Sequence, residues 1–227
     1  MITQSPPIKI GSVIHNAFVF DPKNRQALKM DENAINKAVG RLFALFQSRQ
    51  VDFLLVGGIA LLSYVEGRNT EDLDLIMALP DLKKLPEIQI TSQDSYFARG
   101  SFEGLKIDLL LTSNPVFAMV QKKHATRRPF QEQEIPTATV AGLALLKLYA
   151  LPSLYRQGDF SRVGLYENDL AALVYAYEPD LTAIIRELSP FVTGGDMDEI
   201  QNILSEIQGR IARFRSKSNP TKENHQP

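Results

Sequence analysis

The stretch LLVGGIALLSYVEGRNTEDLDLIM, residues 54–77, decides the fold. Its apolar start runs into Gly57-Gly58, which predicts a short buried strand followed by a glycine turn. The next residues, IALLSYVEG, are typical of a helix that ends at Gly67. DLDLIM, residues 72–77, alternates carboxylates with aliphatic residues, as a strand does when one face is buried. This order of elements predicts an α/β sheet.

Three carboxylates lie on the strands of this predicted sheet. Asp72 and Asp74 are two residues apart, so their side chains project from one face while Leu73 points into the core. Asp108 lies in LKIDLL, a later predicted strand, and pairing of the two strands would bring all three acids to one edge. Like charges are kept together mainly where cations neutralise them. The set therefore predicts a site for two Mg²⁺ or Mn²⁺ ions, suited to phosphoryl or nucleotidyl transfer, the alternative being a solvated acidic strand face.

Candidate phosphate-binding groups flank the Asp pair. Gly57 and Gly58 offer backbone N–H groups at a strand-to-helix junction, where no Cβ blocks a phosphate oxygen. Ser63, Arg68 and Thr70 are further candidates for binding a triphosphate, although Ser63 also fits an ordinary position on a helix surface.

The rest of the chain extends this plan. Residues 31–50 carry apolar positions at helical spacing, with Asp31 as a candidate N-cap. Two strands joined near Glu103-Gly104 follow the short helix after residue 77, and from Asn114 onward the pattern is helical, with Thr137 or Thr139 as a cap. We expect an N-terminal extension (1–30), an α/β domain (31–136), a helical domain (137–215) and a flexible tail (216–227).

Composition excludes several classes of protein. The 227 residues are 44% apolar and 22% charged, which is typical of a globular chain. A net charge of -1 does not indicate a strongly basic nucleic-acid binder. The absence of Cys excludes disulfides, thiolate nucleophiles and Cys-zinc sites. No apolar run approaches the roughly 20 residues that span a bilayer, and no signal peptide is evident, so we expect a cytoplasmic protein with no membrane partner.

A basic run, QKKHATRRPF (121–130), has two interpretations. A solvated helix end explains such a cluster, but beside a nucleotide site it would bind the backbone of an RNA acceptor. The residues concerned are Lys122, Lys123, Arg127 and Arg128.

Taken together, these motifs resemble a known family. A Gly-Gly after a strand, then Arg68-x-Thr70-x-Asp72-x-Asp74 after a helix, and Asp108 on a later strand, resemble the DNA polymerase β-type nucleotidyltransferase superfamily. The helical second half is most similar to the AbiEii/MenT-like group of bacterial nucleotidyltransferase toxins. The resemblance implies a nucleotidyltransferase-type mixed sheet with flanking helices, followed by a C-terminal helical bundle.

The resemblance also implies an activity. A nucleoside triphosphate such as ATP or GTP would donate its nucleoside monophosphate to an acceptor hydroxyl, with two Mg²⁺ ions bound and pyrophosphate released. The implied acceptor is tRNA or a protein, and a toxin role would imply a cognate antitoxin. Lys147 and Asp169 match the lysine and aspartate that complete the site in AbiEii-like members.

Alternatives remain open at this stage. Lys147 also fits the polar position of an amphipathic helix, and Asp169 fits a helix N-terminus. The acceptor could instead be a small molecule of the antibiotic type. A third alternative is a nucleotide-binding interaction module without catalysis.

Overall fold

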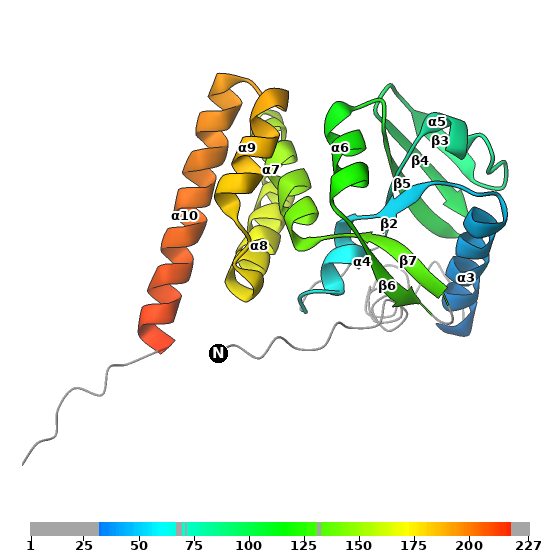
Figure 1. The fold of residues 1–227 in the computed structure, drawn as a ribbon, viewed down its shortest axis with the longest axis horizontal. Helices are drawn as coiled ribbons and strands as arrows, with labels where there is room; N and C mark the ends of the chain where they lie inside the picture. The colour runs from blue at the N-terminus through cyan, green and yellow to red at the C-terminus, as the bar shows by residue number, and fades with distance from the viewer. Residues whose placement is uncertain (1–31, 67–69, 71, 131–132, 219–227) are drawn as a thin grey trace, which may run out of the picture. The chain divides into compact units, whose positions relative to one another are not determined.

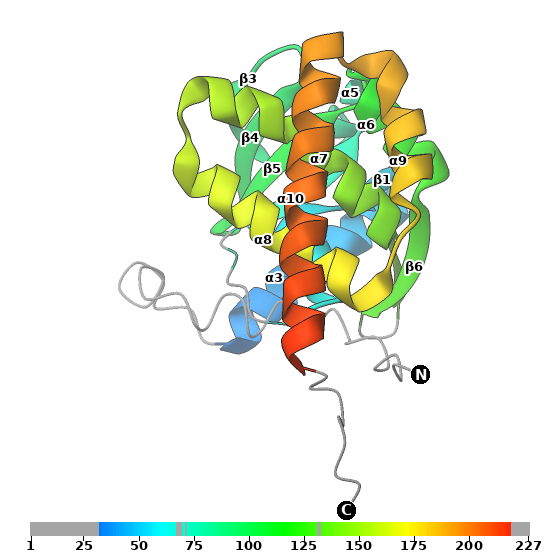
Figure 2. The ribbon, with the colours of Figure 1, turned by 90° about the vertical axis from the view of Figure 1, so that its left-hand side faces the viewer.

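The computed structural model describes residues 32–66, 70, 72–130 and 133–218 (Figure 1), and Figure 2 shows the same elements from the side. The chain divides into two units, residues 1–146 and 147–227. The described residues form eight α-helices, one short 3-10 helix and seven strands. The predicted N-terminal extension, Asp31, Gly67 and Arg68 lie outside the described residues, as does the tail from residue 219.

The first unit is built around a mixed sheet with the strand order β3-β4-β5-β2-β1-β7-β6. β2 pairs with β5, and β1 with β7, in parallel; the other neighbours are antiparallel. The predicted α/β fold class is thereby confirmed. In chain order the elements are α3 (Glu32–Ser48), β1 (Phe53–Leu55), α4 (Gly57–Leu62), β2 (Asp72–Met77), α5 (Leu79–Leu82), β3 (Gln89–Gln93), β4 (Phe97–Phe102), β5 (Leu105–Leu111), α6 (Pro115–Lys123), β6 (Ala125–Phe130), β7 (Gln133–Ala138) and the start of α7 (Val140–Gln157).

The core of this unit follows the predicted patterns. Leu73 and Leu75 of β2 are fully buried, while Asp72 and Asp74 alternate with them on the other face. The apolar stripe of α3 is buried, and its Phe43 packs against Phe53 of β1 with ring centroids 5.7 Å apart. The predicted turn between β4 and β5 is confirmed, with positive φ angles of 49° and 84° at residues 103 and 104.

One region was predicted wrongly. The helical pattern expected from Asn114 onward holds for α6, but residues 125–130 and 133–138 form the antiparallel strands β6 and β7. Pro129 and Pro136, which argue against strands, lie within these two strands. β6 is an edge strand, where a missing N–H is tolerated, and the long-range pairing of β7 with β1 overrides the local signal.

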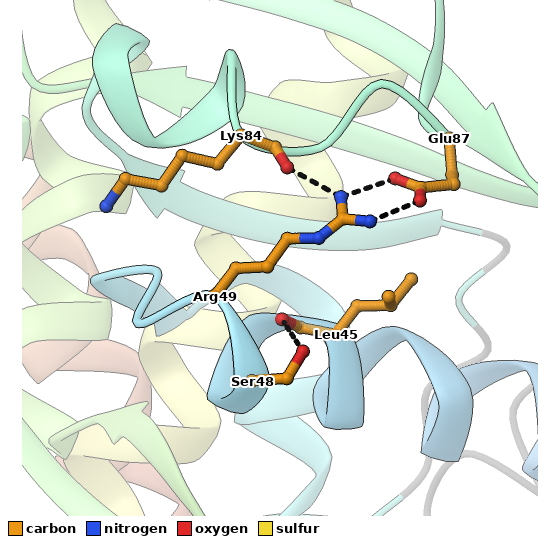
Figure 3. Close-up of polar contacts among 5 residues, drawn as sticks. All are labelled: Leu45, Ser48, Arg49, Lys84 and Glu87. Atoms are coloured by element: carbon orange, nitrogen blue, oxygen red, sulfur yellow. Dashed lines mark hydrogen bonds and ion pairs between the residues drawn. The ribbon is translucent and has the colours of Figure 1, made fainter.

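The end of α3 is tied to the segment between α5 and β3 (Figure 3). Arg49 Nη1 donates to the carbonyl of Lys84 and to Glu87 Oε2, each at 2.6 Å, and Nη2 also contacts the Glu87 carboxylate. These hydrogen bonds hold the pKa of Glu87 below its ordinary value. They stabilise a connection that contains little regular structure.

The second unit consists, in its described part, of helices. After α7 come α8 (Phe160–Tyr177), α9 (Leu181–Leu188), the 3-10 helix η1 (Ser189–Phe191) and α10 (Gly194–Ser218), a long helix that packs against α8 (Figure 2). Thr139 caps α7 as predicted, since the N–H of Gly142 donates to Thr139 Oγ1 at 3.2 Å. None of the described helices is long and apolar enough to cross a membrane.

Candidate functional site

The three predicted carboxylates share one face of the sheet. β2 and β5 pair in parallel with Asp74 beside Asp108, and Asp72 lies two residues before Asp74. Residues that pair across parallel strands, and residues two apart on one strand, point to the same side of a sheet. We term Asp72, Asp74 and Asp108 the acidic face. All three side chains are half-buried. The pairing of β2 with β5, on which the sequence argument depended, is present.

Groups of the protein itself contact two of these carboxylates. The backbone N–H of Gly58 donates to Asp74 Oδ2 at 3.2 Å. Arg99 of β4 lies in register with Asp108, and its Nε is 3.5 Å from Asp108 Oδ1. The side chains of Arg99 and Asp108 are 58% and 32% exposed. Part of the repulsion between the acids is therefore offset without any bound ion.

Sequence reasoning missed Arg99, although a signal was available. The turn at residues 103 and 104 fixes the pairing of its two strands, because Phe102 faces Leu105. Counting outward from that pair places Arg99 opposite Asp108. The hairpin predicted from the sequence is therefore sufficient to place Arg99 beside Asp108.

The two glycines leave room for the side chains around them. Gly57 has φ +62°, and a Cβ there would lie 1.8 Å from Asp74 Oδ2. A Cβ on Gly58 would lie 2.5 Å from Thr70 Oγ1. Both residues belong to the first turn of α4, which ends at Leu62. The prediction of a glycine turn followed by a helix up to Gly67 is therefore wrong on two points: the glycines are part of the helix, and the helix is shorter. In this structure the Gly-Gly pair lets Asp74 and Thr70 approach the backbone closely; its role in phosphate binding stays a prediction.

Two further triphosphate candidates are buried. Ser63 is 1% exposed and its hydroxyl donates to the carbonyl of Ala60 at 2.6 Å. The Thr70 hydroxyl lies 3.4 Å from the carbonyl of Asp72, to which it donates. The predicted contacts of these hydroxyls with a nucleotide stay predictions, and Ser63 does not lie on a helix surface.

The structure does not gather the basic run on one surface. Lys122 and Lys123 are exposed in the last turn of α6. Arg127 and Arg128 are consecutive on β6, so they project from opposite faces. Arg128 lies over the ring of Tyr64, 4.4 Å from its centroid, and its buried Nε has no hydrogen-bond partner in the described part of the chain.

Lys147 and Asp169 form a buried ion pair in the second unit. Lys147 Nζ donates to Asp169 Oδ2 at 2.6 Å, and it also lies 4.3 Å from the ring centroid of Tyr166. Both side chains are 6% exposed, so the alternative of a solvated lysine stem is wrong. Asp169 lies well inside α8, so a helix N-terminal role is wrong as well. Their predicted nucleotide-binding role is untested by this geometry.

The acidic face suits a hard cation by its chemistry. Carboxylate oxygens are the donors that Mg²⁺ and Mn²⁺ prefer, and Asp74 and Asp108 are neighbours in register. In the conformation described, however, no three His, Asp or Glu side chains among the residues that the structure describes are placed to hold one ion together. Asp74 accepts from the N–H of Gly58, and Asp108 faces Arg99. The carboxylates are therefore of the right donor type for such a cation, but their side chains would have to rearrange to bind one together.

A separate hollow of about 570 Å³ lies between α8 and α10, within the second unit. Its lining contains none of the predicted site residues and consists of Glu167, Glu206, Gly209, Arg210 and Arg213. Glu167 accepts hydrogen bonds from the Tyr155 hydroxyl and from Arg210 Nη2. The hydrogen bond to Glu167, with burial and nearby carboxylates, raises the pKa of Tyr155 to about 12.

Comparison with solved structures identifies the fold. No family model and no curated protein sequence matches this chain. An antigenic nucleotidyltransferase-like protein from Paracoccidioides brasiliensis superposes with a TM-score of 0.52 at 15% identity, covering 80% of this chain and 90% of that one. The antibiotic-resistance factor ANT(2'')-Ia gives 0.47 at 10% identity, covering 81% and 96%. A putative nucleotidyltransferase from Thermotoga maritima gives 0.40 at 11% identity, covering 61% and 96%. The first of these likenesses shows that the chain has a nucleotidyltransferase-like fold.

Proposed function

We propose that this protein is a metal-dependent nucleotidyltransferase that transfers a nucleoside monophosphate from a nucleoside triphosphate to an acceptor hydroxyl. The observation that carries the proposal is the in-register pairing of Asp74 with Asp108, with Asp72 on the same face, in a nucleotidyltransferase-like fold. A solvated strand face would not require a glycine with φ +62° to make room for one of its acids.

The proposed reaction assigns a role to each acid. Asp72, Asp74 and Asp108 would hold Mg²⁺ or Mn²⁺, which supplies charge neutralisation for the attacking and leaving oxygens when bound. A carboxylate oxygen of Asp108 accepts the proton of the acceptor hydroxyl. The acceptor oxygen forms a bond to the α-phosphorus, the bond from that phosphorus to the bridging oxygen breaks, and pyrophosphate leaves.

The triphosphate contacts belong to the same proposal. The Gly57-Gly58 backbone lies next to Asp74, a proposed metal ligand, and a phosphate oxygen bound there would replace Asp74 Oδ2 at the N–H of Gly58. The further nucleotide-binding residues proposed are Ser63, Arg68, Thr70, Lys147 and Asp169. For the last two the resemblance is the sole support, since their mutual ion pair already balances both charges.

The test is incubation with each of the four α-labelled nucleoside triphosphates and Mg²⁺, with and without bulk tRNA. In Asp74→Asn/Asp108→Asn we expect transfer to fall by about 100-fold or more, the range typical of a lost general base. Glu103→Gln removes an exposed carboxylate from the same β4–β5 hairpin and serves as the matched control. Equal transfer by the double variant and the wild type would refute the proposal, and nucleotide binding without pyrophosphate release would favour the binding-module alternative.

The acceptor is proposed to be tRNA or a protein, with a small antibiotic-type molecule as the alternative. Since Arg127 and Arg128 lie on opposite faces of β6, one of them at most joins Lys122 and Lys123 on an RNA-binding surface. Steep loss of tRNA binding with added salt, and a shallower slope in Lys122→Ala/Lys123→Ala, would support the RNA acceptor. Salt-insensitive transfer to a small hydroxyl compound would support the alternative.

Membership of the AbiEii/MenT-like group, and with it a toxin role balanced by an antitoxin, is the finest level of the proposal. Expression of the wild-type chain in a bacterial host would then arrest growth. Asp72→Asn, which leaves the buried face of β2 unchanged, should relieve the arrest. Equal growth of the two strains would refute the toxin role and leave the transferase proposal standing.

A further inference from the structure

Arg99 is a cation placed at the end of a row of acids. Across the sheet, Asp74 of β2 lies beside Asp108 of β5, and Asp108 lies beside Arg99 of β4. These three side chains point to the same face, because paired residues on neighbouring strands share a side of the sheet. Asp108 therefore lies between a second carboxylate and a guanidinium.

The contact between Arg99 and Asp108 is looser than two other arginine pairs in the described part of the first unit. The Nε of Arg41 donates to both carboxylate oxygens of Glu103, at 3.0 and 2.9 Å. Arg49 donates to the carboxylate of Glu87 through both terminal nitrogens. Arg99 instead approaches one oxygen of Asp108 at 3.5 Å and is 58% exposed. Exposed pairs of this kind contribute little to stability, so an arriving group displaces the arginine at small cost.

A divalent cation between Asp74 and Asp108 would compete with this arginine. The ion and the guanidinium are both positive and both seek the Asp108 carboxylate, so their interaction through that carboxylate is repulsive. In the described conformation the acids do not form one ligand set, and Asp108 is turned to Arg99. The arginine thus favours the arrangement in which Asp108 is not available to an ion.

We propose that Arg99 is a positioning residue that holds Asp108 away from the metal-binding arrangement until a divalent cation and the nucleotide displace it. The inference rests on the proposed function, because it requires the acidic face to bind metal. Once displaced, the planar guanidinium is free to contact a phosphate oxygen of the same nucleotide. Arg99 therefore opposes the metal alone and favours the metal together with the nucleotide.

The test is calorimetric titration of the full chain with Mn²⁺, first without nucleotide. Arg99→Ala should bind Mn²⁺ about threefold to tenfold more tightly than the wild type, since one unit charge acts on a divalent ion across a few ångströms of partly screened space. Arg99→Lys should give an intermediate affinity. Arg41→Ala removes an exposed arginine from an ion pair outside the acidic face and should leave Mn²⁺ affinity unchanged.

A second titration adds a non-hydrolysable nucleoside triphosphate at saturating Mn²⁺. Here Arg99→Ala should bind the nucleotide about threefold or more weakly than the wild type, so the two affinities move in opposite directions. A purely structural role of Arg99 would weaken both or neither, and either of those results overturns the inference. If Asp74→Asn/Asp108→Asn binds Mn²⁺ as the wild type does, the proposed function fails first and the inference fails with it.

Discussion

Each of the two units contains an ion pair, and the two pairs differ in burial and in distance. Lys147 and Asp169 are 2.6 Å apart with side chains 6% exposed, whereas Arg99 and Asp108 are 3.5 Å apart with side chains 58% and 32% exposed. In the buried pair both charges are largely removed from solvent, so separating them is costly. In the open pair each partner has water as an alternative. Breaking the buried pair is therefore costly, whereas the open pair separates at small cost.

The buried pair should show the largest effect on stability. Asp169→Asn removes the carboxylate that faces the buried ammonium of Lys147, and we expect the free energy of unfolding to fall by about 3–5 kcal/mol. Urea denaturation measures it. Replacing both partners in Lys147→Met/Asp169→Leu should recover most of the loss, because no uncompensated charge remains. A single variant that unfolds like the wild type would remove the contrast between the two pairs.

Gly57→Ala tests the close approach of the Asp74 side chain to the backbone at Gly57. The left-handed backbone at φ +62° costs a non-glycine residue about 1–2 kcal/mol, and displacement of the Asp74 carboxylate adds to that loss. Gly209→Ala is the matched control, since a Cβ there meets no atom within 4 Å and α10 should gain about 0.8–1.0 kcal/mol. Thermal unfolding of the two variants should therefore shift in opposite directions.

Asp108→Asn should have a small effect on stability despite a large effect on transfer. The variant loses one loose contact with Arg99 and relieves repulsion from Asp74, so we expect the free energy of unfolding to stay within about 1 kcal/mol of the wild type. Urea denaturation beside the labelled-nucleotide assay separates the two readouts. A loss like that of Asp169→Asn would mean that the acidic face supports the fold.

The smallest expected effect lies at Tyr155, whose hydroxyl donates to Glu167. Its pKa is raised from 10.0 in the unfolded reference to about 12, so this stabilising contribution is fully present below pH 10 and is lost as pH rises through about 12. Unfolding free energy between pH 10 and 12 should fall less steeply in Tyr155→Phe than in the wild type. Parallel curves would show that the hydrogen bond does not couple to stability.

Much of the central sheet was predictable because its signals are local. The alternation in residues 72–77 and 105–111 reports which side chains are buried, and the turn at residues 103 and 104 reports where the chain reverses. The same alternation places Asp72 and Asp74 on one face, whereas bringing Asp108 beside them depends on the pairing of β2 with β5. A period of two residues carries this information without reference to the rest of the chain.

What could not be predicted depends on distant partners. β3 has no apolar alternation, as all five of its residues are exposed, and it exists as a strand through its pairing with β4. The β6–β7 hairpin carries a proline in each strand and forms because β7 joins β1. The burial of Lys147 with Asp169 depends on the packing of α7 with α8, which no spacing within either helix specifies.

The parallel pairing of β1 with β7 can form only late in synthesis of the chain. Leu55 pairs with Thr137, so one side of β1 stays bare until more than eighty further residues have left the ribosome. During that interval the apolar residues of Phe53–Leu55 form an exposed sheet edge open to other nascent chains. Contacts so far apart in sequence also slow folding. A chain released before residue 133 would lack β7, the strand that pairs with β1, and we expect it to aggregate where the full chain folds.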